Sequence, residues 1–379
     1  MGPTAAELVD HAVATGLVPG AVLAAGVRTP YPVLLHVAGH AQRDAAATRS
    51  MTADTVFDLA SLTKVVGTLP VMLRLAGRGD IGLDQPVSRY LPRFTEEGAD
   101  EGAGRAGRAG GAGRAGKNTV TVRQLLLHIS GLPGVRRYYL ELHDPGEILS
   151  AALAEPLVAP PGTAFAYSDV GFISLGELAE AVTGAGLDEL VQEAVCGPLG
   201  MTATRYLPPA GWASRIAATE VVDGVAKVGV VHDENAEILG GVAGHAGLFG
   251  TAADLARYAA AWAGNADEDA LLLEGAGRDS GPLWGMRAEA LRCQTEGLGA
   301  RRGLGWGLRR DIYDNMGDGW PAAGAGHTGF TGTSLSLDPV SGLWAVLLTN
   351  AVHFGRGPEH SVVGLRKQVH AAVAADLLG

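Results

Sequence analysis

Apolar residues along the 379-residue chain predict strands near both ends and helices in the middle. Short apolar runs that are bounded by proline and glycine turns are typical of strands. Five such runs lie near the ends of the chain, at 21–27, 33–38, 304–308, 334–337 and 343–349. The last two flank the turn-forming segment 338–342 (Asp-Pro-Val-Ser-Gly), which predicts a β-hairpin.

Apolar residues with helical spacing dominate the middle of the chain and also occur at both termini. The pattern in residues 5–13 predicts a helix before the first strand, and residues 362–378 predict another after the last. The helices predicted between them are 61–79, 119–128, 147–154, 170–183, 187–195 and 251–263. Because Pro70 falls inside the first of these, we expect a kink there.

This order of elements predicts an α/β (α+β) fold with one antiparallel sheet assembled from both ends of the chain. N- and C-terminal helices are expected to flank the sheet, and an all-helical domain is inserted between its halves. The predicted domains are residues 1–60 with 301–379 for the sheet, and 61–300 for the helices. Residues 98–116 are mostly Gly, Ala and Arg, so we expect a mobile surface insertion there.

Composition indicates a globular chain and gives no support to polyanion binding. Hydrophobic residues make up 47% of the chain and charged residues 18%, and the formal net charge is −11. Such an acidic chain favours neither nucleic acid nor an anionic membrane as a partner. The sequence contains no run of 18 apolar residues and no basic, apolar leader, so we expect a cytoplasmic protein. The oligomeric state is left open.

Cysteine and histidine usage predicts neither a disulfide framework nor a metal site. The two cysteines, Cys196 and Cys293, are interpreted as unreactive thiols. Histidines and carboxylates gather at 232–234 and at His245, but their spacing fits no standard zinc site. We therefore interpret them as pocket lining or loop structure, and we expect no cofactor.

Three short motifs carry the candidate chemistry. In the first, Ser61-Leu62-Thr63-Lys64, the helical spacing places Lys64 one turn after Ser61 on the same face. An amine near a hydroxyl can help to make a serine nucleophilic, and a helix N-terminus favours an oxyanion. The second motif is Tyr167-Ser168-Asp169, in a loop of the helical part. The third, His327-Thr328-Gly329, opens a strand whose edge offers backbone donors to a substrate.

The three motifs, in this order, resemble those of the serine β-lactamase and penicillin-binding-protein superfamily. The tyrosine in the middle motif resembles the branch of class C β-lactamases, D-alanyl-D-alanine carboxypeptidases and esterases. The resemblance covers nearly the whole chain. It implies acyl transfer from a small-molecule ester or amide through an acyl-Ser61 intermediate, without a metal or a cofactor.

The resemblance also implies catalytic roles. Ser61 is the expected nucleophile, and Lys64 helps to remove its proton. Tyr167 is expected to act as the base and then as the acid for the leaving group. The backbone N–H groups of Ser61 and Phe330 are expected to form the oxyanion hole. The base is left open between Lys64 and Tyr167, because a charged amine is a poor base but can stabilise a phenolate.

The expected substrate-binding residues are Asp169, His327, Thr328 and Gly329. Asp169 stands where many relatives carry Asn, and its carboxylate is expected to pair with Lys64 and keep it charged. His327 replaces the lysine that is usual in β-lactamases, so binding of a substrate carboxylate should strengthen below about pH 6.5. Both departures favour ester or atypical amide substrates.

Several functions therefore stay open. The first is a serine hydrolase acting on a small-molecule ester or amide. The alternatives are an acyltransferase that uses an amine or alcohol as acceptor in a biosynthetic pathway, a D-alanyl-D-alanine carboxypeptidase or β-lactamase, and a non-turnover sensor. His128 and Ser168 are interpreted as structural, and Trp306 and Phe330 either contact substrate or pack in the core.

Overall fold

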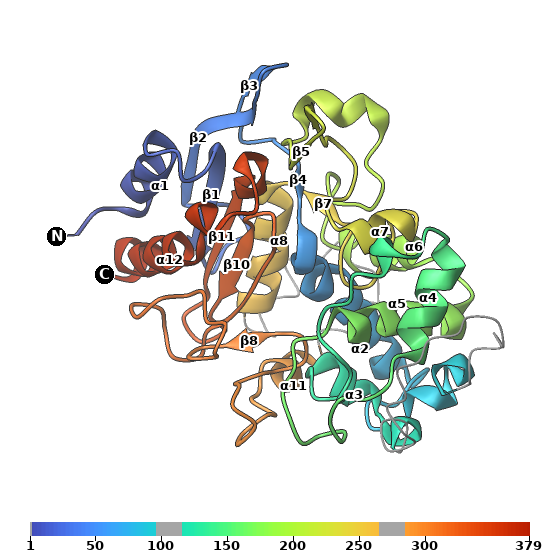
Figure 1. Cartoon of the computed structure of the whole chain (residues 1–379). Helices are drawn as coiled ribbons and strands as arrows, with labels where there is room; N and C mark the ends of the chain where they lie inside the picture. Colours follow the sequence, from blue (N-terminus) through green and yellow to red (C-terminus); the bar gives the residue numbers. More distant parts are fainter. Residues whose placement is uncertain (1, 96–115, 265–284) are drawn as a thin grey trace.

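A computed structural model describes residues 2–95, 116–264 and 285–379 (Figure 1). Strands from both ends of the chain form one seven-stranded sheet in the order β3-β2-β1-β11-β10-β9-β8. The strands are β1 (Gly20–Val27), β2 (Leu34–Arg43), β3 (Thr48–Ser50), β8 (Gly307–Leu308), β9 (Ala325–Thr328), β10 (Ser334–Leu337) and β11 (Leu343–Thr349). At its centre β1 runs antiparallel to β11, with Ala21 opposite Thr349. This confirms the prediction of one antiparallel sheet built from both ends.

Helices cover both faces of the sheet, which explains why its central strands are apolar throughout. The two terminal helices α1 (Ala5–Ala14) and α12 (Val363–Leu378) pack on one face, and α8 (Ala252–Ala263) packs on the other. Successive side chains of a strand point to opposite faces of the sheet. Leu23 of β1 therefore packs in the core beneath α1 and α12, and Val22 packs in the core beneath α8.

The remaining helices lie between the two groups of strands in the sequence. They include α2 (Leu69–Arg78), α3 (Val122–Leu126), α4 (Pro145–Ala154), α5 (Asp169–Thr183), α6 (Leu187–Val191), α7 (Glu234–Ile238) and α11 (Arg287–Ala290). Two small pairs of strands accompany them: β4 (Phe57–Asp58) with β7 (Phe249–Gly250), and β5 (Val221–Val222) with β6 (Val225–Ala226).

The predicted division into 1–60 with 301–379 and 61–300 stays a prediction. The helix α8 does not follow this division. It falls inside 61–300 in the sequence, but it packs against β1, β10 and β11 of the sheet. The predicted insertion at 98–116 lies, apart from Gly116, outside the described residues. Among those residues no single helix has the length and apolar composition of a membrane span, although the bent pair Asp169–Thr183 and Leu187–Cys196 passes this test when taken together.

The predicted helix at 61–79 consists of three segments with different geometry. A 3₁₀ turn at Ala60–Leu62 leads into a π-helical segment at Lys64–Thr68 and then into α2. Pro70 lies in the first turn of α2, where its missing N–H is tolerated. We predicted a kink at Pro70, but the irregular helical geometry lies before Pro70. It falls on the segment that carries Lys64.

Candidate active site

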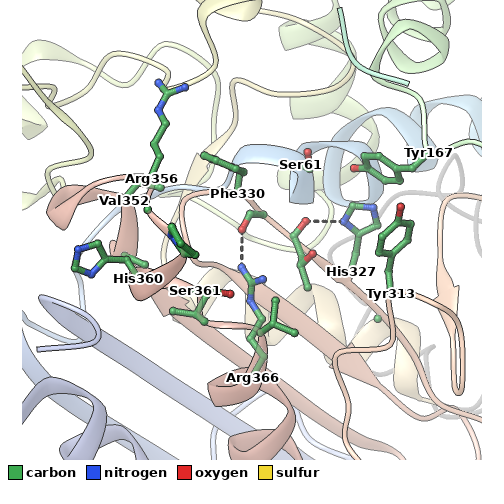
Figure 2. A pocket seen from close by; sticks show the side chains of 18 of the residues that line it. Ser61, Tyr167, Tyr313, His327, Phe330, Val352, Arg356, His360, Ser361 and Arg366 are labelled. Atoms are coloured by element: carbon green, nitrogen blue, oxygen red, sulfur yellow. Dashed lines mark hydrogen bonds between the residues drawn. The ribbon is translucent and has the colours of Figure 1, made fainter. Parts of the chain in front are cut away.

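A cavity of about 520 Å³ brings the three sequence motifs together (Figure 2). The motif residues that line it, with the residue that follows the third motif, are Ser61, Tyr167, His327, Thr328, Gly329 and Phe330. Segments that are more than 100 residues apart in the sequence thus share one wall. Lys64 and Asp169 do not line the cavity, and they lie behind Ser61 instead.

Lys64 is fully buried, and its ammonium has several polar neighbours. Its Nζ donates a hydrogen bond to Ser61 Oγ at 2.9 Å and another to the backbone oxygen of His245 at 3.1 Å. It also lies 2.7 Å from Asp169 Oδ1. This arrangement confirms the expected pairing of Asp169 with Lys64, while contact of Asp169 with a substrate stays a prediction.

Two opposing effects set the pKa of Lys64. Burial lowers it, because a charged amine loses its hydration, but the neighbouring Asp169 and Tyr167 raise it. The net pKa lies above the usual value, since the carboxylate and the phenol outweigh the cost of burial. Lys64 is therefore an ammonium at neutral pH and a hydrogen-bond donor to Ser61, not a proton acceptor.

Tyr167 lies on the loop that precedes α5, between two histidine rings. The centroid of its ring is 4.6 Å from that of His128 and 5.9 Å from that of His327. The Lys64 ammonium lies 5.0 Å from the same centroid. Figure 2 shows the hydroxyl end of Tyr167 directed toward Ser61. A phenol in this place can exchange a proton with the serine or with a leaving group.

Hydrogen bonds at the start of α5 explain why Tyr167 is fixed. The Ser168 hydroxyl donates to the Pro133 carbonyl at 2.6 Å and accepts from the Gly171 N–H at 3.0 Å, which caps the helix. The Ser168 N–H donates to His128 Nδ1 at 2.9 Å. Ser168 and His128 thus have the structural roles predicted for them.

The turn after β9 packs directly against the segment that precedes Ser61. Thr331 Oγ1 donates to the Asp58 carbonyl at 2.8 Å, and Thr333 Oγ1 donates to the Leu59 carbonyl at 3.1 Å. A Cβ on Gly329 would lie 2.4 Å from the Leu59 oxygen, so only glycine fits there.

This packing brings the Phe330 backbone to the nucleophile. Within the described residues, the backbone N–H groups of Ser61 and Phe330 donate to no backbone or side-chain acceptor. Two unused N–H groups at this place are the feature that an oxyanion hole needs. The Phe330 side chain is 63% exposed and stacks on the His232 ring, with centroids 5.9 Å apart.

His327 is neutral, and its proton is on Nδ1. Nδ1 lies 2.9 Å from the Thr328 carbonyl oxygen, which can only accept, so Nε2 carries the lone pair. Burial lowers the pKa of His327 well below 6.5, and the nearby Arg302 and Lys64 lower it further. We expected His327 to bind a substrate carboxylate more strongly below about pH 6.5. This pH range is wrong, because the ring gains a proton only at much lower pH.

Arg302, Tyr313 and Arg366 are among the residues that line the cavity and that sequence reasoning missed. Arg366 is a charged residue at a buried position of α12, which is the signal that the sequence offered. Its Nη2 donates to the carbonyls of Gly329 and Thr333 at 2.6 and 2.9 Å, and burial lowers its pKa to about 10. Tyr313, 55% exposed, has no comparable signal.

The histidines at 232 and 245 each lie close to one carboxylate. His245 Nε2 lies 3.0 Å from Asp233 Oδ1, and His232 Nε2 lies 3.3 Å from Glu220 Oε2. The part of the chain that the structure describes holds no group of three or more His, Cys, Asp or Glu placed to bind a metal ion. Glu220 comes from outside the predicted cluster.

Two further sequence interpretations are decided by packing. Trp306 is fully buried and packs edge-on against Trp262, with centroids 5.2 Å apart, so it belongs to the core. Cys196 is buried, and burial with the nearby Asp254 raises the pKa of its thiol to about 12. This agrees with an unreactive thiol.

Comparison with known proteins agrees with this geometry. The beta-lactamase family model matches residues 5–364. A protein of Escherichia coli (strain K12), provisionally named a D-alanyl-D-alanine carboxypeptidase, is 32% identical over 327 residues, which cover 80% of this chain and 70% of that protein.

Solved structures share the fold. A penicillin-binding protein homologue from Caulobacter crescentus aligns with a TM-score of 0.70 at 22% identity, over 98% of this chain and 96% of that one. EstCE1, described as a hydrolase with promiscuous acyltransferase activity, aligns with a TM-score of 0.65 at 22% identity, over 96% of each chain. At these identities the structural likeness shows the fold alone.

Proposed function

Because the chain belongs to the beta-lactamase family, we propose that it is a serine hydrolase in which Ser61 accepts an acyl group from a small-molecule ester or amide. The observation that carries this proposal is the contact of the Lys64 ammonium with Ser61 Oγ at 2.9 Å, at the wall of a large cavity. The unused N–H groups of Ser61 and Phe330 support it.

In the proposed reaction, Ser61 Oγ attacks the carbonyl carbon and passes its proton to Tyr167, which acts in its phenolate form and becomes a neutral phenol. The carbonyl oxygen becomes an oxyanion that accepts hydrogen bonds from the N–H groups of Ser61 and Phe330. The bond to the leaving alcohol or amine then breaks, and Tyr167 returns the proton to the leaving group. Water repeats these steps on the acyl-Ser61 intermediate and releases a carboxylic acid.

Among the two candidate bases, the electrostatics favour Tyr167. Lys64 is held as an ammonium by Asp169, so it has no lone pair to accept the serine proton. Lys64 thus serves as a donor that orients Ser61 and as a fixed positive charge 5.0 Å from the centroid of the Tyr167 ring.

Near His327 and Phe330 the cavity supports an uncharged part of the substrate, whereas Arg302, Arg356 and Arg366 line other parts of its wall. His327 presents a lone pair on a neutral ring, which accepts a hydrogen bond from an N–H or O–H group but repels a carboxylate. The exposed rings of Tyr313 and Phe330 add apolar surface. We propose an ester with an apolar or aromatic leaving group as the substrate class, and a cytoplasmic location stays a prediction.

A pre-steady-state assay with a p-nitrophenyl ester tests the proposal. We expect a burst of p-nitrophenol equal to the enzyme concentration, steady turnover, and an acyl adduct on Ser61 by mass spectrometry. Ser61→Ala should abolish all three. The control is Ser150→Ala, because Ser150 is an exposed serine of α4 that does not line the cavity. Full activity in Ser61→Ala, with no adduct on wild-type Ser61, would disprove the mechanism.

A second candidate is acyl transfer to an amine or alcohol. The size of the cavity, which extends from Ser61 to Arg366, favours it, since an acyl group alone does not need about 520 Å³. Adding an amine to the burst assay measures the share of product that is amide. A D-alanyl-D-alanine peptide in the same assay tests the activity for which the Escherichia coli relative is named. Labelling of Ser61 without turnover would indicate a sensor.

A further inference from the structure

We propose that Asp58 is a positioning residue, whose buried carboxylate holds the backbone of Ala60 in the conformation that presents Ser61 to the substrate. The inference rests on the proposed function, because it concerns the same nucleophile. Asp58 does not line the cavity, so it does not touch a substrate. It acts through the chain segment between β4 and the 3₁₀ turn.

Both oxygens of the Asp58 carboxylate are used. Oδ1 accepts the Ala60 N–H at 2.8 Å, and Oδ2 accepts the His232 N–H at 2.6 Å. The residue is 2% exposed, so water does not replace these bonds. An aspartate that accepts from the backbone two residues ahead stabilises a tight turn, and here the turn leads directly into the nucleophile.

Ala60 needs this support because its backbone is strained. Its φ is +47°, in the left-handed region that residues with a Cβ rarely adopt. Such conformations persist where surrounding contacts determine them, and they gather at functional sites. The hydrogen bond from Ala60 to Asp58 holds the strained residue immediately before Ser61.

Asp58 also lies where three parts of the site meet. Its carbonyl accepts from Thr331 of the turn that carries Phe330, and β4 pairs with β7 through Asp58 and Phe249. Its bond to His232 reaches the segment that ends at His245, whose carbonyl accepts from Lys64. A change at Asp58 is therefore expected to disturb the nucleophile and its oxyanion donors together.

The same geometry predicts a dependence on pH. Burial raises the pKa of Asp58 to about 6, although the N–H groups of His232 and Ala60 lower it. Of the charged groups near it, Asp233 raises this pKa and Lys227 lowers it. A protonated carboxyl places an O–H where an N–H already points, so one of the two hydrogen bonds is lost. Acylation should therefore slow as the pH falls through about 6.

The test is Asp58→Asn, with the acylation rate measured from the burst at pH 5 to 8. The amide NH₂ faces a backbone N–H, so one hydrogen bond is lost at every pH. We expect acylation at pH 7.5 to be roughly 10- to 100-fold slower, with a smaller change in KM. The decline below pH 6 that wild type shows should be absent.

Asp254→Asn is the matched control. Asp254 is also a buried carboxylate whose pKa burial raises, and it accepts from the Ala203 N–H at 2.8 Å and from Thr204 Oγ1 at 3.0 Å. It does not line the cavity. We expect a loss of stability in this variant without a change in acylation or in its pH profile.

Ala60→Gly supplies a rescue. Glycine adopts a positive φ at no steric cost, so the double variant Asp58→Asn with Ala60→Gly should recover part of the lost acylation rate. If Asp58→Asn does not fold, Ala60→Gly alone tests the inference. Its acylation rate should decline less below pH 6 than that of wild type. An unchanged decline in the acylation rate overturns the inference.

The two proposals fail in different ways. If wild type forms the Ser61 adduct but Asp58→Asn acylates at the wild-type rate with the same pH profile, the role of Asp58 is wrong and the serine mechanism stands. If wild type forms no adduct on Ser61, the proposed function itself fails.

Discussion

Two buried cations lie near the nucleophile, and their surroundings shift their pKa values in opposite directions. Lys64, behind Ser61, has Asp169 at 2.7 Å, and its pKa is raised in spite of burial. Arg366, on α12, donates to two backbone carbonyls, and burial lowers its pKa to about 10. Among the described residues no carboxylate forms an ion pair with it.

The difference shows what a carboxylate partner adds to a buried cation. Neutral carbonyls accept hydrogen bonds from Nη2 of Arg366, but they do not compensate for the lost hydration of its charge. The Asp169 carboxylate does so for Lys64. The ammonium near Ser61 is therefore kept charged, whereas the guanidinium holds the turn that carries Phe330.

Breaking the ion pair should have the largest effect. Asp169→Asn leaves Lys64 buried without a counter-charge, so we expect its pKa to fall below the usual value. The free energy of unfolding should fall by about 3–5 kcal/mol. Urea unfolding measures the stability, and titration of isotope-labelled, methylated Lys64 measures the pKa.

The control for this variant is Glu193→Gln. Glu193 pairs with Arg74 at the same distance of 2.7 Å, but its side chain is 66% exposed. Solvent screening should limit that loss to about 1 kcal/mol or less. Equal losses in the two variants would contradict the importance of burial.

Acid pH should have the next largest effect, through neutral buried histidines on the sheet side. Burial lowers the pKa of His370 to about 3 and that of His327 well below its usual range. Because the unfolded state then binds more protons, stability is present above about pH 6.5 and is lost as the pH falls. Each such histidine should cost about 1.4 kcal/mol per pH unit.

Urea unfolding at pH 4.5, 5.5 and 6.5 measures this loss, and His370→Gln should show a shallower pH slope than wild type. Asp58 acts in the opposite direction, because its raised pKa favours folding as the pH falls below about 6. A slope unchanged by His370→Gln would show that this ring is charged in the folded protein.

Removing the second cation should cost less than breaking the pair. Arg366→Met deletes two hydrogen bonds to the turn 329–333, but it also removes the cost of burying an uncompensated charge. We expect a net loss of about 1 kcal/mol in the free energy of unfolding. Acylation should slow, because Phe330 is held less firmly.

Burst kinetics with the p-nitrophenyl ester would measure that rate. Arg366→Lys keeps the charge but loses the planar fork, so it should slow acylation to a similar degree. If acylation slows only in the methionine variant, the charge of Arg366 matters more than its hydrogen bonds. Arg366 would then resemble Lys64 in acting through its charge.

The smallest effect on stability is expected at the cavity rim. Phe330→Ala removes an exposed ring but keeps the backbone N–H, so stability should change by about 0.5 kcal/mol or less. KM should rise for esters with aromatic leaving groups and stay nearly constant for short alkyl esters. A fall in kcat with unchanged KM would place the side chain in the chemical step instead.

Local patterns predicted most of the fold. The runs at 334–337 and 343–349 are β10 and β11 with the bounds that the sequence indicated, because a turn and two apolar runs define a hairpin locally. The helix predicted at 119–128 is shorter, at Val122–Leu126, and its start is set by the capping box that Thr121 and Gln124 form. The π-helical segment at Lys64–Thr68 has no such local signal.

The residues of the candidate site were likewise predicted only in part. The three motifs named the residues that meet in the cavity, since each residue type carries its own chemistry. The sequence did not indicate that Tyr313 and Arg366 join them, because their positions depend on how the C-terminal third packs. The tautomer of His327 depends likewise on a carbonyl that only the strand geometry places.

By itself the sequence determined the order of strands and helices, the antiparallel sheet made from both ends, and the presence of a hydroxyl, an amine and a phenol in three motifs. Only the tertiary structure decided that His327 is neutral, that Tyr313 and Arg366 line the cavity, and that the Asp58 carboxylate accepts the N–H of Ala60, whose φ is positive. The reason is physical: periodicity and turn chemistry act between neighbours in the chain. Hydration and Coulomb energies depend on distances and burial that exist only after folding.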